Sequence, residues 1–164
     1  MGSVFNYLFN PNGRISRSSY WLQFILPYIG ISVAASVIDM IITPDLAAAG
    51  GGIVGTIVAL FYFWPSIAIP VKRFHDRGMT GWWVLFFALM LIAAIAVAAI
   101  GFAALGGLDE NPAGIAVGAV GIIAALVVGI WQLVILGFLP GQKMPNQYGP
   151  DPLNPNAGTA ETFA

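Results

Sequence analysis

Four long runs of apolar residues, separated by short polar segments, dominate the hydrophobic pattern of this sequence. The runs cover residues 20–42, 53–71, 81–105 and 113–139. An α-helix rises roughly 1.5 Å per residue, so about 20 apolar residues cross a hydrocarbon core of about 30 Å. Each run is long enough to do so. We therefore predict an all-α integral membrane protein with four transmembrane helices in a bundle.

Small residues inside these runs predict close packing between helices. Pairs of glycines four residues apart occur at Gly51/Gly55 and at Gly114/Gly118. In membranes, such pairs let two helix backbones approach each other. We expect both pairs to be packing surfaces inside the bundle.

Two of the runs have features that need a separate explanation. The first run, residues 20–42, is longer than the apolar region of a secretory signal peptide, which has about 7–15 residues, so we expect a retained helix. The second run contains Pro65 and Pro70, each of which removes a backbone donor. We expect a kink in this helix near them.

Composition supports a lipid environment and excludes several functions. Of the 164 residues, 59% are hydrophobic and only 8% are charged, whereas a soluble domain has about a quarter charged residues. The net charge of −1 predicts no nucleic acid partner. There is one histidine and no cysteine, so we predict neither a metal site nor a cofactor.

Two more polar segments flank the transmembrane domain of residues 20–139. Residues 1–19 contain apolar positions at helical spacing, before a turn signal at residues 10–13, and Ser16 as a candidate N-cap of the first long helix. We expect a short interfacial helix here, with a disordered terminus as the alternative. Residues 140–164 contain five prolines and no periodicity, which is typical of an irregular tail.

The placement of the cations predicts the topology. All six lie before the first run, in the middle connection or in the tail: Arg14, Arg17, Lys72, Arg73, Arg77 and Lys143. Neither of the other two connections contains a cation. Under the positive-inside rule, both termini are then cytoplasmic.

Three motifs in this order resemble a bacterial family, the domain of unknown function 805. They are GRISR with Tyr20-Trp21, KRFHDRG with TGWW at residues 72–83, and Pro140-Gly141 with Asn146 and YGPDP at residues 148–152. Members look like small multi-span inner-membrane proteins. The resemblance therefore implies the bacterial cytoplasmic (inner) membrane as the location, and little about activity.

By the predicted topology, all three motifs lie on the cytoplasmic face, where they could form one polar collar. We define the polar collar by its nine candidate binding residues: Arg14, Arg17, Arg73, His75, Asp76, Arg77, Asn146, Tyr148 and Asp151. Its candidate partners are anionic lipid headgroups, a protein, a second copy of the chain, or the chain itself. Alternatively, the cations only set the topology and the tail only caps the bundle. Tyr148 either folds back on the membrane face or lies in an exposed turn.

The adjacent pair His75-Asp76 invites a catalytic interpretation. Neighbouring residues on a helix do not face each other, so Asp76 is expected to pair with an arginine: Arg14, Arg17 or Arg73. We predict no catalytic residue and a non-enzymatic binding or structural protein, whose polar collar contacts lipid headgroups or a partner protein. The alternatives are a subunit of an oligomeric transporter or channel and an enzyme that modifies lipid headgroups. No ionisable residue lies near the middle of a run, which argues against an ion-coupled carrier.

Overall fold

The computed structural model describes residues 4–155 and divides the chain into two compact units. The first contains Met1–Gly81 and Pro140–Ala164, and the second contains Trp82–Leu139. The predicted tail therefore belongs to the first unit, and its residues 156–164 lie outside the described part of the chain.

The all-α class and the four membrane-length helices are confirmed. Each unit contains two helices that are long and apolar enough to cross a membrane. They run over Arg17–Ile42, Ile53–Asp76, Trp82–Ala104 and Pro112–Phe138. No strand occurs in residues 4–155, where the only extended pairings are two isolated bridges in the tail.

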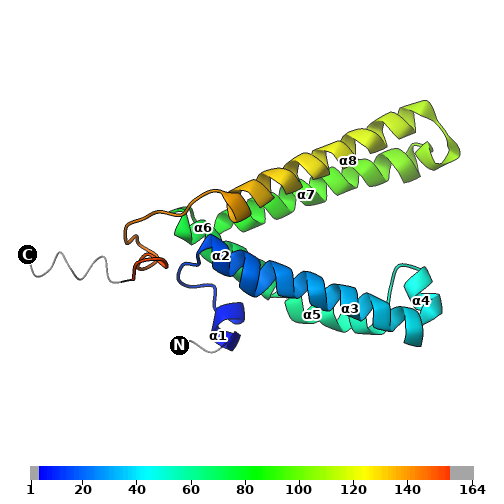
Figure 1. Cartoon of the computed structure of the whole chain (residues 1–164). Coiled ribbons are helices and arrows are strands. Elements are labelled where there is room, and N and C mark those ends of the chain that lie inside the picture. Colours follow the sequence, from blue (N-terminus) through cyan, green and yellow to red (C-terminus); the bar gives the residue numbers. More distant parts are fainter. Residues whose placement is uncertain (1–3, 156–164) are drawn as a thin grey trace, which may run out of the picture. The chain divides into compact units, whose positions relative to one another are not determined.

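In the first unit, two antiparallel helices lie side by side, and a short helix connects their far ends (Figure 1). α1 (Val4–Phe9) precedes α2 (Arg17–Tyr20), which continues through a π-helical segment into α3 (Leu26–Ile42). After α4 (Pro44–Ala48), the chain returns through α5 (Ile53–Phe63) and α6 (Pro65–Asp76). The Ser16 hydroxyl accepts the Ser19 N–H at 3.2 Å, so the predicted N-cap is confirmed.

The returning helix is interrupted where the prolines predict it. α5 ends at Phe63, Trp64 lies between the two helices, and Pro65 begins α6. The Ser66 hydroxyl donates to the Phe63 carbonyl at 2.7 Å, so a side chain supplies a donor at the break. Pro70 lies inside α6 without ending it.

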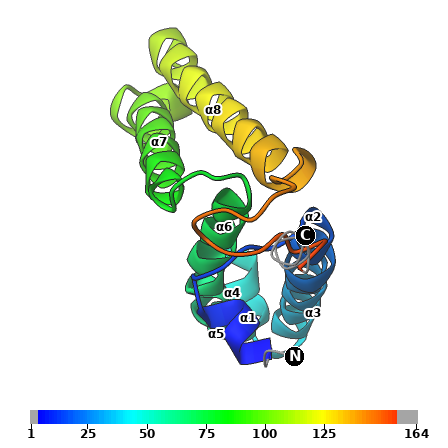
Figure 2. The same cartoon turned by 90° about the vertical axis from the view of Figure 1, so that its left-hand side faces the viewer.

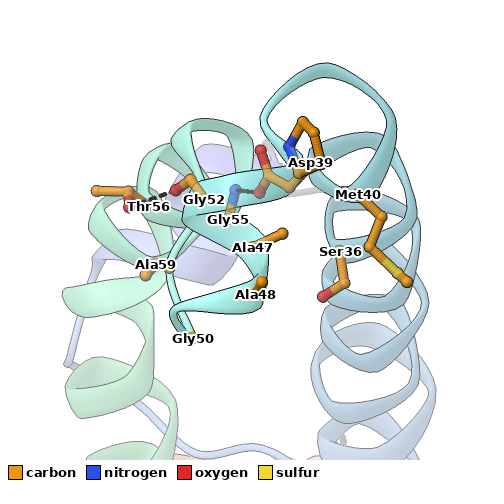
Figure 3. A pocket seen from close by; sticks show the side chains of 12 residues that line it. Ser36, Asp39, Met40, Ala47, Ala48, Gly50, Gly52, Gly55, Thr56 and Ala59 are labelled. Atoms are coloured by element: carbon orange, nitrogen blue, oxygen red, sulfur yellow. Dashed lines mark hydrogen bonds between the residues drawn. The ribbon is translucent and has the colours of Figure 1, made fainter.

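A carboxylate joins the far ends of α3 and α5 (Figure 3). Asp39, on α3, accepts the N–H groups of Val54 and Gly55 at 2.9 and 2.7 Å. It thereby caps the N-terminus of α5, where unpaired N–H groups and the helix dipole favour a negative charge. A Cβ on Gly52 would lie 2.1 Å from the Asp39 carboxylate, so only glycine leaves room for this contact.

In the second unit, two helices pack with their backbones in contact. α7 (Trp82–Ala99) continues to Ala104, and α8 (Pro112–Leu133) continues to Phe138, each through a π-helical segment. Gly118 is buried against Phe102 of the first of these helices, and Gly114 is buried against Gly101 and the connection at Leu105 and Gly107, as predicted for packing glycines. The other predicted pair differs, because Gly51 lies in the turn before α5 and Gly55 faces Asp39.

Candidate functional site

A buried ion-pair cluster lies at the end of α6, entirely within the first unit. The Asp76 carboxylate pairs with Arg14 at 3.0 Å, with side-chain exposures of 5% and 1%, and with Arg73, which is fully buried. Two of the three arginines named as partners of Asp76 are therefore its partners. Because two arginines share this one carboxylate, the remaining N–H groups of Arg14 need other hydrogen-bond acceptors.

The tail supplies those acceptors. The Arg14 guanidinium donates to the backbone carbonyls of Gln142, Met144 and Gly149, the last two at 2.8 and 3.2 Å. The Gln142 N–H donates in turn to the Asp76 carbonyl at 2.8 Å. Figure 2 shows the tail, in orange and red, beside the ends of α6 and α2. Arg14 thus links the N-terminal segment, α6 and the tail.

A glycine allows the tail to pass against the cluster. A Cβ on Gly141 would lie 1.9 Å from the Asp76 carboxylate, so any larger residue would displace the tail. Gly141 and Gln142 were not among the predicted site residues. The signal was present, because Pro140-Gly141 is part of the third motif.

His75 is also occupied by the tail. Its ring stacks on the Tyr148 ring, with centroids 3.8 Å apart and planes 2° apart, and its Nδ1 lies 3.3 Å from the Gly13 carbonyl. The Asn146 side-chain amide donates to the His75 carbonyl at 2.9 Å. Tyr148 therefore folds back onto His75 at the end of α6. Within residues 4–155, His75 thus contacts Gly13, Asn146 and Tyr148.

The remaining members of the polar collar lie around this cluster. Arg77 ends α6, and its N–H donates to the Phe74 carbonyl at 3.0 Å. Arg17 is exposed at the start of α2, and Asp151 is buried in the tail. Arg17, Asp76 and Asp151 line one small cavity of about 110 Å³. The structure therefore brings all nine predicted residues into the same unit, six of them in direct contact with one another or with a shared segment.

Contacts of α1 were not anticipated. The buried Lys72 ammonium donates to the Tyr7 carbonyl and lies 4.8 Å from the centre of the Tyr7 ring. The Tyr7 hydroxyl donates to the Ser19 carbonyl at 2.9 Å, and the Trp64 indole donates to the Phe9 carbonyl at 2.7 Å. Burial raises the pKa of Tyr7 to about 12, so its hydroxyl remains a donor at neutral pH. A helix does form here, over Val4–Phe9, and it is tied to α2 and α6, while its position at a membrane interface stays a prediction.

A larger cavity lies at the opposite end of the first unit, beside Asp39. It has a volume of about 680 Å³ and is lined mostly by alanine and glycine, with Ser36, Met40 and Thr56 (Figure 3). Asp39 is 2% exposed, and its oxygens already accept backbone N–H groups. Its role there is to hold α5 against α3.

The cluster at the end of α6 has the chemistry of a structural clasp. The Asp76 carboxylate is bound by two arginines, and the His75 ring stacks on Tyr148. The Asn146 side-chain amide donates a hydrogen bond to the backbone carbonyl of His75. Within residues 4–155, no group of three histidine, aspartate or glutamate side chains could hold a metal ion. We call this cluster the tail clasp and define it by Arg14, Arg73, His75, Asp76, Asn146 and Tyr148.

Four membrane-length helices and a tail clasped to the end of one of them define a small multi-pass membrane protein. The chain belongs to the family described as "Protein of unknown function (DUF805)", whose model matches residues 8–150. The predicted resemblance is therefore confirmed.

Two relatives from Escherichia coli (strain K12) agree with this assignment. The chain is 29% identical to "Uncharacterized protein YiiR" over 91% of its own length and 90% of the relative. It is 34% identical to "Inner membrane protein YhaH" over 49% of its own length and 64% of that protein. No solved structure matches the chain significantly. The chain is a multi-pass bacterial inner-membrane protein.

Proposed function

We propose that this protein is a non-enzymatic membrane protein whose polar collar, together with the neighbouring Lys143, binds lipid headgroups. The observation that supports this proposal is the internal use of its reactive groups. Asp76 is held by Arg14 and Arg73, and His75 is stacked on Tyr148, so both groups are engaged by partners within the chain. Two cations at the edge of the tail clasp, Arg17 and Lys143, are exposed at the surface of the first unit.

The orientation forms part of the proposal: both termini and the tail clasp are cytoplasmic. All six cations of the chain belong to the first unit, and the connections after α3 and α7 have none. A cation near the surface adds about 1 kcal/mol to the attraction of a protein for anionic lipid. The exposed cations would therefore both orient the chain and meet the headgroups.

Cysteine labelling tests the orientation, because the chain has no cysteine of its own. Single cysteines would be placed at Gly2, Ala48, Met79, Gly107 and Thr159, and intact cells treated with a membrane-impermeant thiol reagent. We expect labelling at Ala48 and Gly107 only. Labelling at Met79 would place the end of α6 outside and would contradict a cytoplasmic collar.

Lipid retention tests the binding function. The wild type and the double variant Arg17→Gln/Lys143→Gln would be purified from the membrane and the retained phospholipid counted by native mass spectrometry. We expect the variant to retain several-fold less lipid, since the phosphate loses two cationic partners. Gln147→Ala, at an exposed tail position without charge, is the matched control. Equal retention in all three proteins, or a protein partner that co-purifies in place of lipid, would contradict the proposal.

A further inference from the structure

The small cavity beside the tail clasp has an unusual combination of charges. It is lined by the start of α2, by Asp76 and by two tail segments, residues 140–143 and 151–153. Two exposed cations, Arg17 and Lys143, share this lining with two buried carboxylates, Asp76 and Asp151. A ligand that fits this cavity therefore needs an anionic group for the cations and a cationic group for a carboxylate.

The two carboxylates are not equivalent. Arg14 and Arg73 both pair with Asp76, so two cations face its single negative charge. Asp151 is only 7% exposed and belongs to none of these pairs. One of its oxygens, Oδ1, accepts the Leu153 N–H at 2.9 Å. A buried carboxylate at a cavity wall favours a cationic hydrogen-bond donor.

The two exposed cations favour an anion in the same cavity. Arg17 carries a planar set of N–H donors and Lys143 a compact ammonium, both of which suit phosphate oxygens. The volume of about 110 Å³ accommodates a small polar group and not a whole lipid, so acyl chains would remain in the bilayer.

We propose that this cavity binds a zwitterionic headgroup in which a primary ammonium is linked to a phosphodiester, as in phosphatidylethanolamine lipids. The ammonium is placed against Asp151, and the phosphate against Arg17 and Lys143. This inference rests on the proposed function, because it names the lipid that the polar collar selects.

The chemistry distinguishes this headgroup from its neighbours. A primary ammonium has three N–H donors for the Asp151 carboxylate. The quaternary ammonium of phosphatidylcholine has none, and phosphatidylglycerol has no cation at all. The site should therefore prefer the primary ammonium over both.

Competition between lipids with identical short acyl chains tests the inference. The full-length protein in detergent would be titrated with phosphatidylethanolamine, phosphatidylcholine and phosphatidylglycerol, and binding followed by native mass spectrometry. We expect phosphatidylethanolamine to bind about tenfold more tightly than phosphatidylcholine, since one charge-assisted hydrogen bond is gained. Soluble glycerophosphoethanolamine would be titrated as a fourth ligand. If it bound as tightly as phosphatidylethanolamine, the result would contradict a membrane lipid as the ligand.

Single substitutions assign the preference to this cavity. Asp151→Asn keeps an oxygen for the Leu153 N–H but loses the charge, so it should abolish the preference for the primary ammonium. Lys143→Gln should weaken the binding of phosphatidylethanolamine and of phosphatidylcholine by the same factor, because both lipids contain the phosphate. Gln147→Ala is the control, and thermal unfolding of each variant verifies the fold.

The outcomes separate this inference from the function on which it rests. Equal binding of phosphatidylethanolamine and phosphatidylcholine, or a preference that survives Asp151→Asn, overturns the zwitterionic site. A preference for phosphatidylglycerol overturns it too, yet leaves a lipid-binding collar intact. Binding of no lipid at all overturns both.

Discussion

In the unit of α7 and α8, backbone lies directly against backbone, whereas in the unit of α1 to α6, charged side chains join the segments. A Cβ on Gly121 would lie 2.2 Å from the Ala98 nitrogen, and one on Gly101 would lie 2.1 Å from the Gly118 nitrogen. In the first unit, Asp76 and Asp39 instead hold segments that are far apart in sequence.

This difference shows two ways of holding helices together in lipid. Apolar surface gives little driving force there, because lipid tails are as apolar as the helices, so small residues or polar contacts must supply the attraction. Glycine contact needs no charge, and residues 82–139 contain no cation. Charged contacts can in addition order an irregular tail that has few apolar residues of its own to bury. Four substitutions test the comparison, from the largest expected effect to the smallest.

Asp76→Ala should have the largest effect, because it leaves the buried Arg14 and Arg73 without their carboxylate. Breaking one side of a buried ion pair costs about 3–5 kcal/mol. We expect loss of tail protection in limited proteolysis, together with a large loss of stability. Asp109→Ala, which removes an exposed carboxylate in the other unit, is the control and should leave both unchanged.

Gly121→Ala should destabilise the second unit by about 1–3 kcal/mol, since the added methyl group meets the α7 backbone and forces the helices apart. Gly129→Ala on the same helix has no atom within 4 Å and should instead be neutral or slightly stabilising. Detergent unfolding followed by tryptophan fluorescence measures both. Equal behaviour of the two variants would refute backbone contact as the basis of packing.

Asp39→Ala should loosen the far end of the first unit, because the N–H groups of Val54 and Gly55 lose their acceptor. We expect a lower melting temperature, with a smaller decrease than for Asp76→Ala. Asp39→Asn keeps one oxygen and should lie between the wild type and the alanine variant. A melting temperature unchanged by Asp39→Ala would show that α5 needs no cap from α3.

Tyr148→Leu should have the smallest effect, about 0.5–1.5 kcal/mol, because it removes one ring stacked on His75. Tyr148→Phe keeps the ring and should be close to the wild type. The histidine ring resonances in NMR spectra report the contact directly, since they should shift in Tyr148→Leu and remain in place in Tyr148→Phe. Unshifted resonances in the leucine variant would mean that the stack is absent in solution.

Much of the fold follows from local features of the sequence. These features are the four apolar runs, the Ser16 cap and the break before Pro65. Each depends on hydrophobic period or on backbone chemistry within a few residues, so each can be predicted without tertiary structure. The sequence also indicated which residues belong to the polar collar, because short motifs with one histidine and most of the cations stand out in so apolar a chain.

By itself, then, the sequence determined the lipid environment, the number of membrane-length helices and the candidates for the site. Only the tertiary structure decided which candidates meet. Arg14 contacts residues 62 and 130 positions away, and Asp39 caps a helix that begins after a turn. Such contacts depend on the positions of whole segments in space, which no local period or spacing encodes. For that reason, three candidate partners of Asp76 remained open in the sequence, and the tail clasp became visible only in the fold.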